Sequence, residues 1–255
     1  IGRVGQGAWG RQALSELKNA GVSTRWIGED PAEPTQLNIV AVSTMGERTM
    51  FAYRGANAQL SADMIDQTAL ADAALLHLSG YAFLQPKQAG AALRAIDIAE
   101  RRGIPITLDI PGGVVAALAE KLRPLLPKLD TILLADSDLP QLLDRPGNAT
   151  LDSLVADLLE RGVKRVAIKG HGTDSLLRQA NASDRAPWFS VEVVDTVGAG
   201  DAFAAGHIHG RISGLSGAYC CRLANAFGAV AVTRKGAGQA MPSLDEVFSL
   251  MTATR

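Results

Sequence analysis

A regular alternation of short apolar runs and helical patterns constrains the fold of this chain more than any other feature. Apolar runs occur at 74–78, 104–108, 131–134 and 165–168, and amphipathic helical patterns alternate with them at 87–102, 114–122 and 151–161. Short strands that are apolar at every position are typical of a parallel sheet, because helices cover both of its faces. The sequence therefore predicts an α/β fold: a three-layer α/β/α sandwich with a mostly parallel central sheet, in one domain over residues 1–255.

The segments on either side of this alternation predict smaller elements. WGRQALSELKNAG has a helical pattern with Gly21 placed to end it, and TQLNIVAVST and TMFAYRG predict a hairpin over 36–54 that turns at Met45–Arg48. SLLRQA and WFSVEVV, separated by NASDRA, predict a second hairpin toward the sheet edge. Helical patterns at 202–212, 217–233 and 244–251 complete the chain.

Composition excludes several classes of partner. With 47% hydrophobic and 20% charged residues and a net charge of −1, the chain suits a soluble globular protein without bulk attraction to nucleic acid or anionic lipid. No apolar run reaches the roughly 18 residues of a membrane helix. The two cysteines, Cys220 and Cys221, are adjacent in a helical pattern, which argues against a disulfide framework. We therefore expect a cytoplasmic protein with neither a nucleic-acid nor a membrane partner.

The stretch VDTVGAGDAF at 194–203 is the strongest candidate for a functional loop. It joins an expected strand to an expected helix, and ligands of such sheets gather beyond the carboxyl ends of the strands. Gly198 and Gly200 permit close approach to an anion, and the start of a helix offers free N–H groups to it. Asp201 is then either a general base that takes a proton from an incoming nucleophile or the N-cap of its own helix.

DTVGAGDAF resembles the D-T-x-G-A-G-D signature of the ribokinase-like, PfkB-type carbohydrate kinases. IGRVGQGAWG resembles their G-x-V-G-x-D-x-x-G segment, and LANAFGAVAVTRKGA resembles their last long helix and the loop after it. The resemblance implies a ribokinase-like fold and transfer of the γ-phosphoryl group of ATP, with Mg²⁺, to a hydroxyl of a small sugar or sugar-like alcohol. It implies Asp201 as the base and the amides of Gly198, Ala199 and Gly200 as the anion hole. A nucleoside kinase and a non-catalytic nucleotide- or sugar-binding relative are the alternatives.

The resemblance also implies further site residues. The nucleotide is expected near Thr196, Lys169, Gly170, Gly172 and Asn225, although Asn225 could instead hold a tight helix–loop contact and Lys169 could be solvated. Ser79 and Gly80 occupy a strand end that faces the sugar in relatives, or form a plain turn. Asp195, Val197, Ala231, Arg234 and Gly236 match a monovalent-cation site, here for K⁺, formed mostly by backbone carbonyls. The hairpin at 36–54 is expected to be a lid or dimer contact, which would give a homodimer.

The chain departs from the family pattern at several positions. Leu139 stands where the magnesium segment N-x-x-E has its Glu, so Asp136 is the remaining candidate near Mg²⁺ unless it lies in a plain solvated turn. Gly7 stands where relatives have Asp, and the glycines after Lys169 are shifted. Relatives begin with a strand and a Gly-Gly segment that bind the sugar, and we expect the domain over 1–255 to lack them. His77 is expected to be a core histidine.

Overall fold

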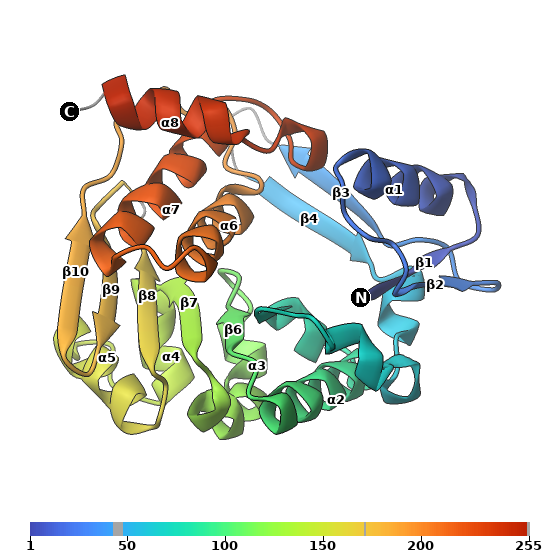
Figure 1. The fold of residues 1–255 in the computed structure, drawn as a ribbon, viewed down its shortest axis with the longest axis horizontal. Coiled ribbons are helices and arrows are strands. Elements are labelled where there is room, and N and C mark those ends of the chain that lie inside the picture. Colours follow the sequence, from blue (N-terminus) through green and yellow to red (C-terminus); the bar gives the residue numbers. More distant parts are fainter. Residues whose placement is uncertain (43–47, 171, 254–255) are drawn as a thin grey trace. The chain divides into compact units, whose positions relative to one another are not determined.

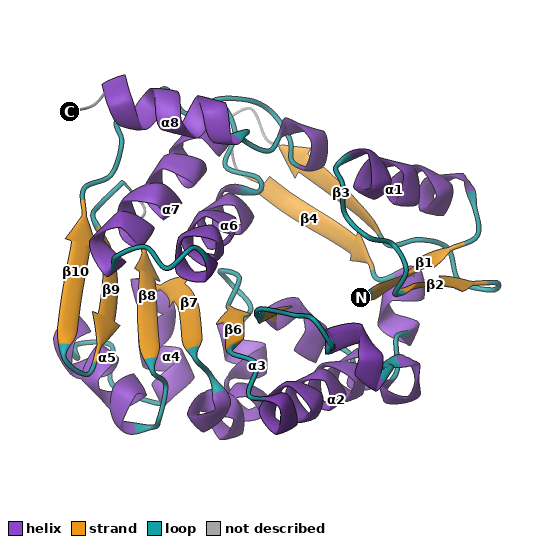
Figure 2. Ribbon diagram, viewed as in Figure 1, coloured by secondary structure: helices purple, strands orange, loops and turns teal. Residues whose placement is uncertain are grey.

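The computed structural model describes residues 1–42, 48–170 and 172–253. The chain divides into two compact units, shown as ribbons in Figures 1 and 2. The first unit comprises residues 1–73 and 82–101, and the second comprises residues 74–81 and 102–255.

The first unit begins with a small parallel pair of strands. β1 (Gly2–Gly5) pairs with β2 (Ile27–Asp30), and α1 (Ala8–Asn19) connects them. Two glycines of IGRVGQGAWG are needed for close packing here, because a Cβ atom on Gly10 would lie 1.8 Å from the carbonyl oxygen of Gly5. A Cβ atom on Gly5 would in turn lie 2.5 Å from the carbonyl oxygen of Glu33. Gly21, at φ +75°, follows the end of α1 as predicted.

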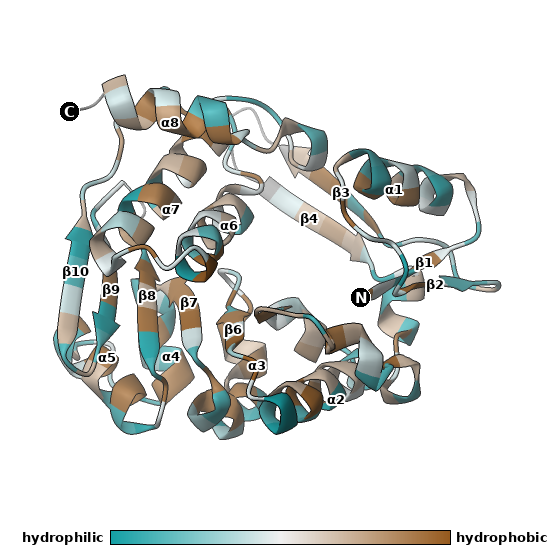
Figure 3. Ribbon diagram, viewed as in Figure 1, coloured by the Kyte–Doolittle hydropathy of each residue, from teal (hydrophilic) through white to brown (hydrophobic). Residues whose placement is uncertain are grey.

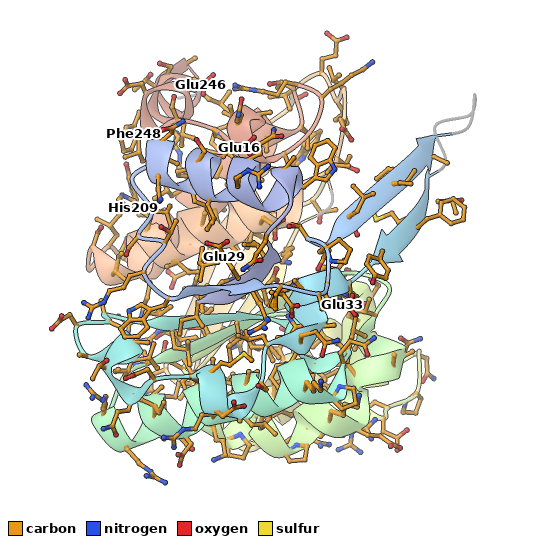
Figure 4. All side chains as sticks on the ribbon, turned by 90° about the vertical axis from the view of Figure 1, so that its right-hand side faces the viewer. Glu16, Glu29, Glu33, His209, Glu246 and Phe248 are labelled. Carbon is orange, nitrogen blue, oxygen red and sulfur yellow. The ribbon has the colours of Figure 1, made fainter. Side chains whose placement is uncertain are left out.

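The predicted hairpin is present as an antiparallel pair of strands. β3 (Leu37–Val42) pairs with β4 (Arg48–Tyr53). Of the turn predicted at 45–48, residues 45–47 lie outside the described residues, and Arg48 begins β4. Side chains project from both faces of this ribbon (Figure 4), and its large apolar residues are exposed; Ile39 is 59% and Phe51 61% exposed. The Tyr53 hydroxyl donates to Glu33 Oε2 at 2.6 Å, which ties the hairpin to the loop after β2. The unit also contains three short 3₁₀ turns at 55–59, 62–64 and 67–70, and residues 86–101 of α2 (Pro86–Arg102).

The second unit contains a six-stranded sheet in the order β10-β9-β8-β7-β6-β5. Its strands are β5 (Leu76–Ser79), β6 (Ile106–Asp109), β7 (Thr131–Ala135), β8 (Arg165–Lys169), β9 (Ser175–Gln179) and β10 (Ala182–Ala186). β5 to β8 are parallel, whereas β9 and β10 form an antiparallel hairpin at the edge. The predicted α/β fold with a mostly parallel sheet is confirmed.

Helices cover both faces of this sheet (Figure 2). On one face, Leu133, Ala167 and Leu177 share a core with residues of α6 (Ala199–Ile212) and α7 (Gly217–Ala231). Successive side chains of a strand point to opposite faces, so the fully buried Ile132 and Leu134 face α3 (Val115–Leu122), α4 (Leu139–Leu143) and α5 (Leu151–Glu160). α8 (Leu244–Ala253) packs against α7. No helix in the described part of the chain is long and apolar enough to cross a membrane.

Glycines bring α6 and α7 into unusually close contact. A Cβ atom on Gly206 would lie 2.9 Å from Cα of Ala224 and 2.8 Å from the Phe227 ring. One turn further along α6, a Cβ atom on Gly210 would lie 2.9 Å from Cys220 Sγ. The spacing of four residues places both glycines on the same face of α6. This face is therefore the contact that fixes α6 in the unit.

The edge hairpin differs from the prediction. Its second strand is β10, within the segment NASDRA that was predicted to be the connection, and WFSVEVV is not a strand. The polar residues of β10 appear in hydrophilic colours in Figure 3, in contrast to the apolar β7. An edge strand has a solvent-facing side, so it does not need the apolar composition on which the prediction relied. The short strands β1 and β2 were not predicted either.

Candidate active site

Polar residues gather where the parallel strands of the second unit end. Ser79 ends β5, Asp109 ends β6, Lys169 ends β8, and Asp136 follows β7 directly. The register pairs Ser79 with Asp109 and Ala135 with Lys169, so these strand ends are aligned. Ligands of parallel sheets bind at this edge.

The glycine-rich loop begins α6 at the same edge. Gly198 is the N-cap residue at φ +80°, and a Cβ atom there would lie 2.6 Å from Met241 Cε, so both the conformation and the space require glycine. The Ala202 amide closes the first helical turn on the carbonyl of Gly198 at 2.8 Å. Of the amides that precede it in the turn, that of Ala199 donates to the carbonyl of Thr196 at 3.3 Å. None of them has an acceptor within the helix, and they carry the positive end of the helix dipole. The loop can therefore hold an anion such as a phosphate.

Asp201 is the third residue of α6, and its side chain is exposed. Because Gly198 is the N-cap, the interpretation of Asp201 as the N-cap of its own helix is wrong. The helix begins three residues before the predicted 202, which places Asp201 in its first turn. An exposed carboxylate there is free to receive a proton from a bound ligand.

Lys169 points into this region and is not solvated. Its ammonium group forms an ion pair with Asp109, and the two side chains are only 11% and 5% exposed. Its Nζ would lie 3.5 Å from a Cβ atom on Gly200, so the ammonium group lies beside the anion-hole turn. Burial raises the pKa of Asp109, against the opposing effect of the Lys169 charge. The arrangement holds a positive charge next to the loop amides.

Two residues of this cluster escaped the sequence prediction. Asp109 directly follows the apolar run at 104–108, which is the position that drew attention to Asp136 and Lys169 in other strands, so the same signal could have found it. His77 is exposed on β5, and the expectation of a core histidine is wrong. Partial desolvation of the ring by the surrounding protein lowers the pKa of His77, whereas the charges of Asp109 and Asp201 raise it. These three residues therefore lie within electrostatic reach of one another.

Asp195 joins the two loops that were predicted to form a cation site. Its Oδ1 accepts from the Val197 amide and its Oδ2 from the Gly236 amide, both at 3.0 Å. The Asp195 amide donates to the carbonyl of Val232, just beyond Ala231 at the end of α7. Arg234 forms an ion pair with Glu246 at 2.6 Å. The predicted residues are thus brought together, with the Asp195 carboxylate engaged by backbone amides.

The remaining nucleotide candidates lie around this loop. The Asn225 amide donates to the carbonyls of Ala186 and Pro187, both at 2.9 Å, and so secures the chain that leaves β10. Thr196 is exposed. After β8, a Cβ atom on Gly170 would lie 2.0 Å from the carbonyl oxygen of Thr173, and Gly172 has φ +70°. These glycines are therefore needed for the tight turn that follows Lys169.

The magnesium and sugar candidates occupy neighbouring strand ends. Asp136 is exposed and accepts from the Ser137 amide at 2.7 Å, whereas Leu139 is fully buried at the start of α4. Ser79 Oγ accepts from the Tyr81 amide at 3.4 Å. A Cβ atom on Gly80 would lie 3.3 Å from the carbonyl oxygen of Asp109. Leu139 therefore supplies no carboxylate beside Asp136. Within the described ranges, no group of three or more His, Cys, Asp or Glu side chains could hold a metal ion.

Comparison with known proteins identifies the family of the chain. The family model described as "pfkB family carbohydrate kinase" matches residues 1–244. The chain is 26% identical to fructokinase-1 of Zea mays, over 98% of this chain and 81% of that protein. It is 30% identical to an ATP-dependent ribose-1-phosphate kinase of Halopiger xanaduensis, over 99% of this chain and 79% of that protein. A provisionally assigned ribokinase II from E. coli, solved with ATP and Mg²⁺, superposes with a TM-score of 0.90 at 27% identity, over 99% of this chain and 82% of that one.

Proposed function

Because the chain belongs to the pfkB family of carbohydrate kinases, we propose that it transfers the γ-phosphoryl group of ATP to a hydroxyl group of a small sugar or sugar-like alcohol. The observation that carries this proposal is the start of α6, where the loop amides, the Asp201 carboxylate and the Lys169 ammonium group lie together. The relatives described above are sugar kinases by name, which favours a sugar over a nucleoside as the acceptor.

The residues divide the chemistry between them. Asp201 takes the proton of the attacking hydroxyl, and the amides of Gly198, Ala199 and Gly200 balance charge on the transferring phosphoryl group. Lys169 adds a positive charge beside Gly200 and contacts a phosphate of ATP. Thr196, Gly170, Gly172 and Asn225 line or support the nucleotide side, and Ser79 and Gly80 line the sugar side.

Magnesium fits this site through water and phosphate oxygens. Mg²⁺ usually keeps several waters and takes only one or two carboxylates, so the single exposed carboxylate of Asp136 is sufficient to anchor it. When bound with ATP, the ion neutralises charge on the phosphates. The buried Leu139 leaves Asp136 as the residue of this segment that would hold it.

A potassium ion is proposed beside the loop that Asp195 organises. Carbonyls of Val197, Ala231, Arg234 and Gly236 would join Asp195 as its ligands, and the ion would order the loop that bears the anion hole. Turnover should therefore rise when K⁺ replaces Na⁺ at constant ionic strength. Equal turnover in the two salts would remove this ion from the proposal.

We further propose that the exposed hairpin β3–β4 is a lid or dimer contact, so that the protein is a homodimer. An exposed apolar ribbon of this kind is an expected site of association. A reducing compartment such as the cytoplasm suits the two free cysteines.

The proposal is tested by Asp201→Asn. Asn keeps the size of the side chain and leaves the loop amides unchanged, so ATP affinity should persist. Turnover should fall by about 10²–10⁴-fold, because the proton acceptor is lost. Asp152→Asn is the matched control, since Asp152 is also an exposed acid in the first turn of a helix of the same unit. Turnover of Asp201→Asn within a few-fold of the parent would contradict the role of Asp201.

A further inference from the structure

A basic cavity lies at the opposite edge of the sheet from the candidate active site. It has a volume of about 380 Å³ and is lined by Asp130, Lys164, Arg165, Arg211 and the hairpin turn at 179–182. A second cavity of about 200 Å³ shares Arg165 and Arg211 and is also lined by His207. Arg165 begins β8 and Lys169 ends it, so the two regions are separated by about 13 Å along the strand.

The charges of this cavity do not balance. Asp130 is 7% exposed, and its Oδ1 lies 2.7 Å from Arg165 Nη1 and 3.5 Å from Arg211 Nη2. Its Oδ2 accepts from the hydroxyl of Thr131 at 2.9 Å. One carboxylate therefore faces two guanidinium groups, and the exposed Lys164 adds a third positive charge. The lining carries a formal excess of two positive charges.

Two buried nitrogen atoms at these cavities have no hydrogen-bond partner among the described residues. They are Nε of Arg211 and Nε2 of His207, and His207 is only 2% exposed. A buried donor without a partner destabilises the folded protein, and native structures contain few of them. Burial, reinforced by the charge of Arg165, lowers the pKa of His207 to about 4, so the imidazole is neutral at neutral pH and can donate from Nε2. Both residues line the second cavity, and Arg211 also lines the larger one.

We propose that this cavity is a second anion site, which binds the phosphate group of a small phosphomonoester. Guanidinium groups match phosphate oxygens in geometry and charge, and the dianion would neutralise the excess of two positive charges. The larger cavity also has room for a small organic group beyond the phosphate. The ion pairs with Asp130 hold the two arginines in place for this contact. The site is independent of the proposed kinase activity.

The test uses glycerol 3-phosphate as the probe, with glycerol and sodium chloride as references at equal ionic strength. The imidazole NMR signals of the four histidines are followed in the absence of ATP and sugar. His207 lines the second cavity, which shares Arg165 and Arg211 with the proposed site, so its signal reports on this region, whereas His77 reports on the candidate active site. The probe should shift the His207 signal in a saturable way, and glycerol should not.

Arg211→Gln should weaken this binding by about tenfold or more, because it removes charge-assisted hydrogen bonds. Arg161→Gln is the matched control, since Arg161 is also 34% exposed and paired with a partly buried aspartate, but lies outside the cavity. Lys164→Gln alters an exposed side chain, so it should fold normally and weaken binding about threefold. A probe that shifts only His77, or that binds equally to the parent and to both cavity variants, would overturn the proposal.

Discussion

At the scale of single residues, the ion pair of Asp109 with Lys169 can be either functional or purely structural, and its energetics tell the two apart. Desolvation raises the pKa of Asp109 even though Lys169 lies against it. Because the pKa of Asp109 is higher in the folded protein than in the unfolded chain, Asp109 stabilises the fold most at a pH below its unfolded-state pKa. This contribution is lost as the pH rises through its folded-state pKa. At neutral pH the ionised Asp109 therefore costs folding free energy. A residue retained at such a cost is a candidate for function.

We predict that Asp109→Asn is less stable than the parent at pH 7 and turns over about 10–100-fold more slowly. Asn cannot ionise and so avoids the desolvation cost of the carboxylate, but it leaves the buried Lys169 ammonium group without its partner and no longer holds it beside Gly200. Urea unfolding at pH 7 and at pH 4, together with turnover at saturating ATP, measures both effects. Because the pKa of Asp109 is raised in the folded protein, the parent gains stability relative to the variant as the pH falls.

Asp157→Asn is the control with the opposite sign. Hydrogen bonding to Arg161 lowers the pKa of Asp157. Ionised Asp157 therefore stabilises the fold at a pH above its unfolded-state pKa, and this stability is lost as the pH falls through its folded-state pKa. The variant should lose about 0.2–1 kcal/mol at pH 7 and keep its turnover. A large loss of stability in Asp109→Asn with unchanged turnover would instead make the Asp109–Lys169 pair structural.

The sequence predicted functional residues only where neighbouring residues in the chain form a recognisable pattern. Asp201 stands out because glycines and a helix start surround it, and the structure places it in the first turn of α6. The ion pair of Lys169 with Asp109 joins residues 60 positions apart in the chain, and no local pattern encodes it. The contacts of Asn225 with the chain after β10 depend on tertiary packing in the same way.

At the scale of elements, α6 is positioned by a face of glycines rather than by large apolar side chains. Gly206 and Gly210 let the helix approach the backbone of α7. The Asp201 carboxylate and the anion-hole amides belong to the first turn of the same helix. Packing at one end of α6 therefore determines where the proposed catalytic groups lie.

Gly206→Ala should lower the free energy of unfolding by about 1–3 kcal/mol, because the new methyl group would overlap the backbone of α7. Gly228→Ala is the matched control, since its Cβ atom would find its nearest neighbour at an ordinary 3.7 Å. That control should gain about 0.5–1 kcal/mol from the higher helix propensity of Ala. Thermal and urea unfolding measure both values. Equal stability of the two variants would show that α7 can yield at this contact.

The elements that the sequence predicted well are those with a uniform environment. β5 to β8 are interior parallel strands, and their apolar runs identify them without knowledge of the partners. β10 is an edge strand of polar residues, and only its register with β9 makes it a strand. β1 and β2 are four residues each, too short to show a period.

At the scale of the whole molecule, the chain forms two compact units. The first unit carries the exposed hairpin, and the second contains the complete set of strands from β5 to β10. Residues 74–81 return to the second unit between two segments of the first. This division of the chain depends on long-range contacts, and neither a shift in composition nor a linker in the sequence indicates it.

If the hairpin is a dimer contact, the double variant Ile39→Thr/Phe51→Thr should dissociate the protein. The two residues are register partners and hence neighbours on one face, and Thr keeps the strand propensity. Removing two large side chains from each copy costs several kcal/mol, about 10³-fold in the dimer dissociation constant. Analytical ultracentrifugation measures it, with Leu93→Gln as the control for an exposed apolar residue elsewhere in the unit. A monomeric parent at tens of micromolar would contradict the proposal.

The two adjacent thiols of α7 can be used to measure how often α7 separates from the sheet of the second unit. Cys220 and Cys221 are each 3% exposed, and burial raises the pKa of Cys221 to about 12. Neither thiolate forms readily in the folded unit, so a thiol-alkylating reagent modifies them only when α7 separates from the sheet. The alkylation rate therefore counts these openings. Any ligand that binds only the closed unit will slow it in proportion to its occupancy, whichever edge of the sheet it binds.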